Sequence, residues 1–256
     1  MSKEIKIKQL GNGGAFDYLS TNSSFLIEST KNSYFLFDCG YSVYAELRRQ
    51  DELKEIDLNK LKYIYISHMD DDHMGSLKTL IYYMFFILKK RIHILAYAGV
   101  FKELKTYLSD IDGYVENDVK IKDSLFNLIE ITFSKCCTID SFTIESTYAR
   151  HFKECYGLKF KLDRDNEFII SGDTKAEQTL ANKLSYNSVK FAFHDYSNWN
   201  QEDCQVHCCE SDFKRIYFDE NRQNKIIKYH NNEEFNGSWR SFSEIIESLP
   251  KKNKQV

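Results

Sequence analysis

The sequence predicts an α/β sandwich in a single domain rather than a doubly wound parallel sheet. Strands follow one another with few regular helices between them early in the chain, and strands and helices mix in the later part. No repeat or low-complexity linker divides the 256 residues. We therefore expect one domain over residues 1–249 and a charged tail over residues 250–256.

Apolar runs rich in β-branched and aromatic residues predict the strands, and longer runs with a mixed apolar face predict the helices. Along the first part of the chain we expect strands at 5–10, 24–28, 34–38, 63–66 and 92–96, and helices at 75–88 and 100–108. Along the second part we expect strands at 139–147, 156–162, 168–171, 189–194 and 225–229, and helices at 175–184 and 239–249. The polar residues 110–122 predict neither type of element.

Composition and charge limit the classes of partner and compartment. The net charge of −3 gives no basic field, which weighs against a long nucleic acid as partner. Seven cysteines, an odd number without CxxC spacing, and a start without a signal peptide predict a reduced, cytoplasmic protein. The apolar run at 80–88, LIYYMFFIL, is too short to cross a bilayer, so we expect a core helix or a helix that contacts a second copy.

The segment at 67–75, SHMDDDHMG, concentrates side chains that bind metals. His68, Asp70, Asp72 and His73 fall within six positions after a predicted strand. Alternate residues of an extended segment point the same way, so His68 and Asp70 can hold one ion, and the two residues after the turn can face a second. Zinc, manganese and iron suit these ligands, and two such ions can activate a hydroxide. The alternative, a solvated helix N-cap at Asp72, leaves both histidines unexplained.

Three more candidate ligands stand at the ends of later predicted strands. They are His151, Asp173 and His230, and Gly172 allows a tight turn just before Asp173. Each of them alone would more often be an ordinary surface or core residue. His93 is such a case, because it lies inside a predicted strand and we interpret it as a strand histidine.

The order of these motifs resembles the metallo-β-lactamase superfamily. The segments at 10–16 (LGNGGAF) and 37–40 (FDCG) are similar to its opening strands, and the segment at 68–73 is similar to its metal signature. His151, Gly157 and the SGDT at 171–174 resemble the branch with tRNase Z and cyclic-nucleotide phosphodiesterases. The resemblance implies an αββα sandwich, a homodimer and two divalent ions, with these ligands: His68, Asp70 and His151 for one ion, Asp72, His73 and His230 for the other, and Asp173 between them.

Asp70 departs from the usual form of that signature. The superfamily pattern reads His-x-His-x-Asp-His, and Asp70 takes the place of its second histidine. The resulting His-x-Asp-x-Asp-His form also resembles the metallo-β-lactamase-like domain of DNA-uptake channel proteins. A further carboxylate makes the ligand set harder, which shifts its preference from zinc toward manganese or iron, while the imidazoles keep zinc open.

A second set of residues is predicted to move protons. In the tRNase Z-like branch, a His-Glu pair and a later His-Ser-Thr segment help to protonate the leaving oxygen. Here His194-Asp195 and His207-Cys208-Cys209 stand in those places. We expect His207 to act as general acid with Asp195 orienting it, and His194 to be buried support. The alternative is that His207 is an ordinary loop residue.

Clues to the substrate are fewer. Aromatic residues that could stack on a base, or simply pack, are Tyr156, Tyr196 and Trp199. Basic residues that could hold a phosphate, or simply face solvent, are Arg150, Lys153 and Lys175. Only 21 residues separate His151 from Asp173, which leaves no room there for the arm with which bacterial tRNase Z holds tRNA. The absence of such an arm, together with the net negative charge, favours a compact substrate.

These residues together predict a dinuclear metal-dependent phosphodiesterase. The expected substrate is a small phosphodiester, above all a cyclic nucleotide such as a defence-signalling one, and the expected catalytic residues are Asp72, His207 and Asp195. Three alternatives stay open. They are a nuclease on DNA or RNA, a non-catalytic metal-binding or immunity module, and a lactonase or thioesterase on the same fold.

Overall fold

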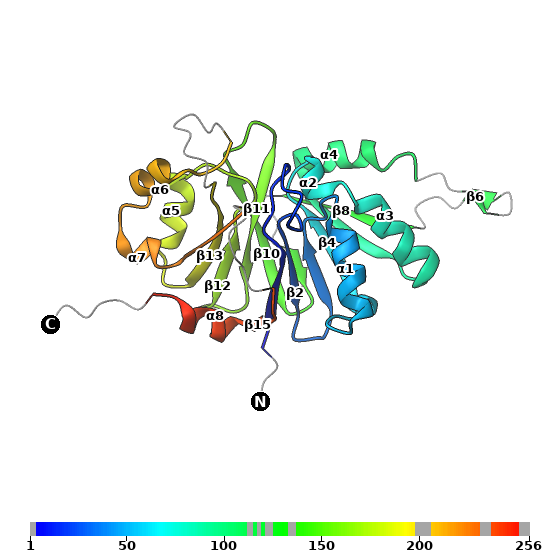
Figure 1. Cartoon of the computed structure of the whole chain (residues 1–256), viewed down its shortest axis with the longest axis horizontal. Helices are drawn as coiled ribbons and strands as arrows, with labels where there is room; N and C mark the ends of the chain where they lie inside the picture. Colours follow the sequence, from blue (N-terminus) through cyan, green and yellow to red (C-terminus); the bar gives the residue numbers. More distant parts are fainter. Residues whose placement is uncertain are drawn as a thin grey trace.

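Two β-sheets pack face to face, and helices cover the outer face of each sheet (Figure 1). The computed structural model describes residues 4–111, 125–132, 137–197, 206–230 and 237–250, and the backbone alone at 115–116 and 119–120. The predicted αββα sandwich is confirmed. The predicted tail lies outside the described residues, apart from Pro250.

The first sheet has seven strands in the order β15-β1-β2-β3-β4-β5-β8. Its strands are β1 (Lys6–Gly11), β2 (Ser24–Glu28), β3 (Tyr34–Phe37), β4 (Leu61–Ile66), β5 (Ile92–Tyr97), β8 (Phe126–Ile131) and β15 (Arg240–Ser241). Neighbours from β15 to β3 are antiparallel, and neighbours from β3 to β8 are parallel. Its outer face carries α1 (Val43–Glu52), α3 (Leu77–Tyr82), the π-helix Tyr83–Ile87 and α4 (Ala98–Tyr107).

The second sheet has six strands in the order β14-β13-β12-β11-β10-β9. Its strands are β9 (Cys137–Ile139), β10 (Phe142–Ala149), β11 (Cys155–Lys161), β12 (Glu167–Ile170), β13 (Val189–Asp195) and β14 (Ile226–Tyr229). The remaining elements are the 3-10 helix Leu58–Lys60, α2 (Asp71–Met74), α5 (Gln178–Leu184), α6 (Glu210–Ile216), α7 (Glu220–Gln223), α8 (Phe242–Ser248) and the hairpin of β6 (Val115–Glu116) with β7 (Val119–Lys120).

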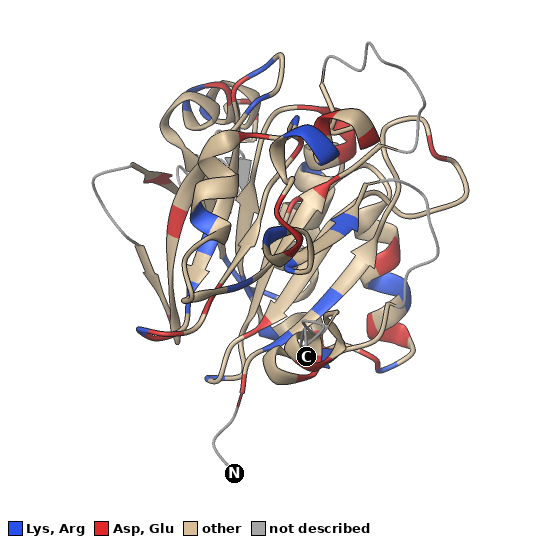
Figure 2. Cartoon of the chain, turned by 90° about the vertical axis from the view of Figure 1, so that its left-hand side faces the viewer, with Lys and Arg blue, Asp and Glu red and all other residues tan. Residues whose placement is uncertain are grey.

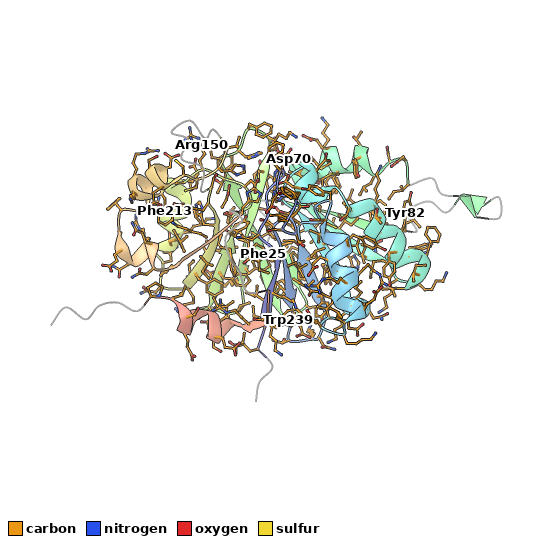
Figure 3. All side chains as sticks on the ribbon, viewed as in Figure 1. Phe25, Asp70, Tyr82, Arg150, Phe213 and Trp239 are labelled. Carbon is orange, nitrogen blue, oxygen red and sulfur yellow. The ribbon has the colours of Figure 1, made fainter. Side chains whose placement is uncertain are left out.

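Aromatic side chains fill the space between the two sheets. Phe25 lies in this space, near the middle of the molecule (Figure 3), with its ring centroid 4.6 Å from that of Phe193 in the opposite sheet. Phe160 and Phe168 stack at 4.5 Å. Leu26, the neighbour of Phe25 in β2, points to the other side and packs with the helix layer. Because both faces of the sheet are covered, the middle of β2 and all of β3 are apolar, and the strands predicted at 24–28 and 34–38 are confirmed.

The predicted helix at 75–88 is confirmed over most of its length. After α2, which ends at Met74, the chain forms α3, and α3 continues directly into a π-helical turn over Tyr83–Ile87. Leu80, Ile81 and Met84 are buried in the core, whereas Ile87 is exposed. This confirms a core role for one face of the run, and contact with a second copy stays a prediction. Among the described helices, none is long and apolar enough to span a membrane.

The loops that follow β4, β10, β12, β13 and β14 meet at one end of the sandwich, near the label for Asp70 in Figure 3. Trp239 marks the opposite end of the molecule in the same view. Basic and acidic residues are interspersed along the ribbon in Figure 2 rather than separated into single-sign tracks. The candidate site therefore lies where strands from both sheets deliver their following loops.

Candidate metal centre

All seven side chains predicted to bind metal lie together at this end of the sandwich. The first four come from the loop after β4 and from α2, and the others follow β10, β12 and β14: His68, Asp70, Asp72, His73, His151, Asp173 and His230. Their roles as ligands stay a prediction, but the shared location is what that prediction requires.

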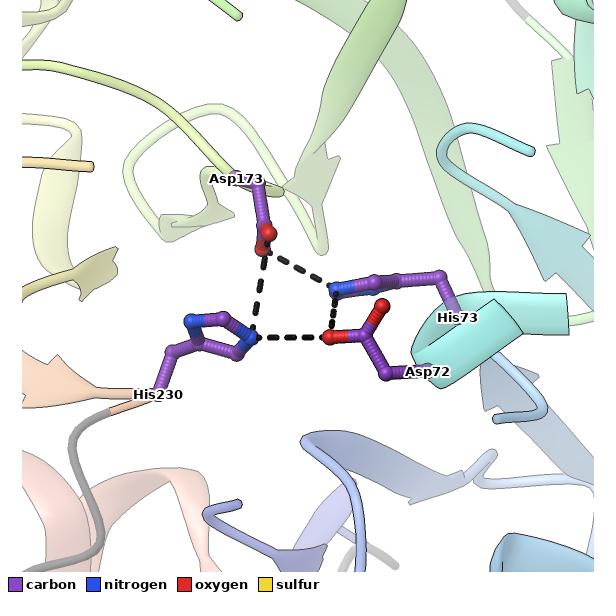
Figure 4. Close-up of side chains that lie close together, drawn as sticks. All are labelled: Asp72, His73, Asp173 and His230. Atoms are coloured by element: carbon purple, nitrogen blue, oxygen red, sulfur yellow. Dashed lines mark hydrogen bonds and ion pairs between the residues drawn. The ribbon is translucent and has the colours of Figure 1, made fainter. Parts of the chain in front are cut away.

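One group consists of Asp72, His73, Asp173 and His230 (Figure 4). The Nε2 atom of His73 lies 3.2 Å from Asp173 Oδ1 and 3.4 Å from Asp72 Oδ2. The Nε2 atom of His230 lies 3.3 Å from Asp72 Oδ2 and 3.7 Å from Asp173 Oδ2. Two imidazole nitrogens and two carboxylates thus face one point, and all four of their ligand atoms lie within 4.8 Å of one another.

A second group shares Asp173 with the first and adds His68 and His151. The Nε2 atom of His68 lies 3.9 Å from Asp173 Oδ2. Asp70 borders this group, because its Oδ2 atom lies 3.4 Å from His68 Nε2 and 4.0 Å from His151 Nε2. Asp173 therefore stands between two sets of candidate ligands, and its role as a shared ligand stays a prediction.

Buried polar atoms without hydrogen-bond partners support a cation at this place. They include His68 Nε2, His73 Nε2 and Asp173 Oδ1, and the exposed fraction of each of these three residues is 2% or less. A buried polar group left unpaired costs about 1–3 kcal/mol, and more when it is charged. A divalent ion between imidazole nitrogens and carboxylate oxygens would satisfy all three atoms, and this donor set suits zinc, manganese or iron.

The electrostatics of the group are those of a site that binds cations. Burial lowers the pKa of His230, but Asp173 together with Asp195 and Asp72 raises it to about 10. Burial raises the pKa of Asp72, yet His73 and His230 hold it far below its usual range. The carboxylates are therefore ionised at neutral pH, and the protons on the imidazoles must leave when a metal ion binds.

Asp38 orients two of the imidazoles, and the sequence analysis gave it no such role. Its Oδ2 atom accepts hydrogen bonds from His73 Nδ1 (2.8 Å) and from the Ser67 hydroxyl (2.7 Å). Because the Ser67 hydrogen is used in this way, its oxygen accepts from His68 Nδ1 at 2.9 Å. Both imidazoles are thereby fixed with Nε2 toward the centre. The one sequence feature that could have indicated this role is the position of Asp38, a carboxylate directly after the buried strand β3.

The loop after β1 shapes the other side of the site. The backbone N–H of His230 donates to Asn12 Oδ1 at 2.7 Å, and His230 has a positive φ of 67°. A Cβ atom at Gly14 would lie only 3.2 Å from His230 Cε1, so glycine allows this close approach. Gly172 has a φ of 67°, which confirms the tight turn predicted before Asp173. Backbone strain of this kind persists where the surroundings hold it, often at functional sites.

The predicted acid–base pair lies next to the candidate metal ligands. His207 Nδ1 donates to Asp195 Oδ2 at 2.8 Å, and the same oxygen accepts from the backbone N–H of Thr174 at 2.8 Å. His207 Nδ1 also lies 3.8 Å from Asp173 Oδ2. Burial lowers the pKa of His207, but the negative charge of Asp195 and its hydrogen bond raise this pKa by more, so the net shift is upward. The side chain of His207 is 23% exposed, whereas Asp195 is fully buried, which places the imidazole at the mouth of the site.

Two further histidines lie apart from the centre, as expected. His194 is buried support, with its Nε2 atom 2.7 Å from the Tyr217 hydroxyl. His93 stacks on Tyr63 in the first sheet, with ring centroids 5.2 Å apart.

Of the residues considered for substrate contact, some are engaged with other side chains and one lies at the centre. Tyr196 is buried and its hydroxyl donates to Glu210, so it packs and does not present a face to a base. Arg150 and Lys175 pair with Glu177 (3.8 Å) and Asp212 (3.5 Å), respectively, whereas Lys153 pairs with Asp70 at the centre. The ring centroid of Tyr156 lies 3.9 Å from that of Tyr97. Trp199 lies outside the described residues.

Comparison with known families decides which group of proteins the chain represents. The family model described as "Anti-Pycsar protein Apyc1" matches residues 5–246. This chain belongs to the Apyc1 family. A family member from Bacillus phage vB_BsuM-Goe3 is 28% identical over 259 residues, which covers 93% of this chain and 94% of the relative. The ribonuclease Z of Borrelia garinii subsp. bavariensis is 26% identical over 168 residues, which covers 64% of this chain and 50% of that protein.

Solved structures confirm the metallo-β-lactamase fold of this Apyc1 family chain. YhfI of Bacillus subtilis, a metallo-β-lactamase fold protein, has a TM-score of 0.68 at 14% identity, and covers 96% of this chain and 93% of its own. The short form of human tRNase Z has a TM-score of 0.67 at 13% identity, with 93% and 99% covered. Unliganded yeast PDE1 has a TM-score of 0.60 at 13% identity, with 95% and 92% covered. The resemblance inferred from the motifs is thus confirmed.

Proposed function

We propose that the protein is a metal-dependent phosphodiesterase that hydrolyses a cyclic nucleotide, with two divalent ions held by the seven residues of the candidate centre. The observation that carries the proposal is the position of Asp173, which is shared by three His/Asp groups, the third with Asp195, His207 and His230, and lies 3.8 Å from His207. The anti-Pycsar name of the family fits the degradation of a cyclic nucleotide. Homodimer formation is part of the proposal as well.

The side chains divide the work of hydrolysis. Bound divalent ions would polarise the phosphoryl group and supply a hydroxide at neutral pH. Asp72 and Asp173 provide the buried negative charge that would hold the cations. Asp38, directly and through Ser67, keeps the Nε2 atoms of His73 and His68 directed toward the centre. His207, held by Asp195, donates a proton to the departing ribose oxygen.

A cleft beside the centre has a size that suits a nucleotide. It holds about 580 Å³ and is lined by Ala15, Phe16, Tyr41, Met69, Asp70, Asp71, Asp72 and Lys153. Sites for small molecules fall between about 300 and 1,000 Å³. The Tyr41 hydroxyl donates to the backbone oxygens of Ala15 (3.0 Å) and Asp17 (3.2 Å), which fixes the loop that carries the exposed ring of Phe16. The wall beside the metal ligands therefore offers an aromatic surface to a base.

The test is a substrate panel with the purified protein loaded with zinc or with manganese. We expect cyclic mononucleotides to be opened to linear monophosphates, and bis(p-nitrophenyl) phosphate to be hydrolysed more slowly. RNA with a 3′ extension and single-stranded DNA serve as controls, and we expect both to remain intact. A protein that cleaves only these polymers, in a manner sensitive to salt, would be a nuclease instead. A protein inactive on every member of the panel would contradict the proposal.

Removal of divalent ions is expected to destabilise the fold. A ligand at 1,000 times its Kd adds about 4.1 kcal/mol to the free energy of unfolding. For a chain of this size, about 1 kcal/mol changes Tm by 2 °C or more, so a chelator should lower Tm by about 8 °C or more. Differential scanning calorimetry with and without chelator measures this shift, and restored zinc or manganese should reverse it. An unchanged Tm would speak against a bound ion.

A further inference from the structure

The two carboxylate oxygens of Asp70 face different partners. Its Oδ2 atom lies 3.4 Å from His68 Nε2 and 4.0 Å from His151 Nε2, on the side of the second ligand group. Its Oδ1 atom pairs with the ammonium group of Lys153. Lys153 stands in the turn between β10 and β11, two residues after His151, so the same turn supplies a candidate ligand and the partner of another.

The ion pair between Lys153 and Asp70 is too exposed to contribute much to the free energy of unfolding. The side chain of Lys153 is 45% exposed and that of Asp70 is 21% exposed. Ion pairs between groups so open to water add little to the free energy of unfolding. Its consequence is local, because the ammonium group both offsets the charge of Asp70 and occupies one of its two oxygens.

We propose that Lys153 is a positioning residue that makes Asp70 a ligand through Oδ2 alone and thereby sets the metal preference of the site. With Oδ1 held by Lys153, Asp70 offers one oxygen and almost no net charge, much as a neutral histidine offers one nitrogen. A set of four ligands that each offer one atom, here His68, Asp70, His151 and Asp173, suits the tetrahedral coordination of zinc. Without Lys153, Asp70 is free to turn both oxygens toward an ion, which favours the harder manganese ion. This inference rests on the metal centre of the proposed function and not on its substrate.

The test is the affinity of Lys153→Met for metal, measured without any substrate. Competition with a chromophoric chelator gives the Kd of the protein for Zn²⁺ and, in a separate titration, for Mn²⁺. We expect zinc affinity, and with it the ratio of zinc affinity to manganese affinity, to fall by about 10- to 100-fold, the range over which metal affinity falls when partners of metal ligands are removed. Lys153→Arg, which keeps the charge, should stay within about threefold of the wild type, because its guanidinium can still hold Oδ1.

Lys62→Met is a matched control. The side chain of Lys62 is 46% exposed and pairs with Asp140 at 3.0 Å, so the variant removes a similar ion pair at a distance from the centre. The decisive comparison uses the background Asp70→His, in which there is no carboxylate for Lys153 to hold. There, Lys153→Met should change the zinc-to-manganese ratio by less than about twofold, since the two residues act through each other.

The outcomes separate this inference from the proposed function. Lys153→Met with the same metal affinities as Lys62→Met overturns the inference and leaves the phosphodiesterase proposal intact. Unchanged affinities together with a raised KM for the cyclic nucleotide also overturn it, because Lys153 would then contact the substrate. A wild-type protein that binds neither Zn²⁺ nor Mn²⁺ overturns the metal centre and the inference together.

Discussion

Asp173→Ala is expected to remove most of the bound metal and nearly all of the activity. Asp173 belongs to every group of candidate ligands, and its oxygens lie 3.2 Å from His73 Nε2, 3.7 Å from His230 Nε2 and 3.9 Å from His68 Nε2. The metal ions of hydrolases stabilise the transition state by several kcal/mol, and each 1.36 kcal/mol is a tenfold change in rate. We therefore expect kcat/KM for the cyclic nucleotide to fall by about 1,000-fold or more.

The measurement combines metal analysis of the purified variant with steady-state kinetics. Asp140→Ala is the control, because Asp140 is also a partly buried, ion-paired carboxylate but lies in the turn between β9 and β10, at the far end of β10 from the centre. This control should keep both metal and activity. An Asp173→Ala protein that retains two ions per chain and full activity would show that the site has been assigned to the wrong residues.

His207→Ala is expected to discriminate between leaving groups. The ribose oxygen that departs from a cyclic nucleotide is strongly basic and needs a proton, which His207 is placed to give through its contact with Asp195. General acids contribute about 10²- to 10⁴-fold, so kcat for the cyclic nucleotide should fall by that factor. The p-nitrophenolate ion is a weak base that leaves unaided, so bis(p-nitrophenyl) phosphate should lose less than about tenfold.

The readout is the ratio of the two kcat values, and metal content is measured beside it. His93→Ala serves as control, since His93 stacks on Tyr63 away from the centre and should leave the ratio unchanged. If His207→Ala slows both substrates by the same factor, His207 supports the metal centre and does not deliver a proton to the leaving group.

Some elements could not be predicted from local sequence. Helix α1 presents only Val43 and Leu47 as buried apolar residues, too few for an apolar periodicity to stand out. The run after Gly75 is apolar throughout, and only its packing decides where α3 becomes a π-helical turn. Strand β8 is partly buried along its middle and lies at the edge of its sheet, so the alternation that announces a strand is weak there.

The sequence by itself determined the fold class and the seven candidate ligands. Metal-binding side chains crowd into the segment 68–73, and the others follow apolar strands, so both signals are local and can be read along the chain. The tertiary structure decided what holds these ligands in place. Three contacts do this: Asp38 with His73, Asn12 with the backbone of His230, and Lys153 with Asp70. The two residues of each contact are 35, 218 and 83 positions apart in the sequence, respectively. Such contacts arise only when two sheets pack and bring distant strand ends together, because no local pattern encodes which loops will meet.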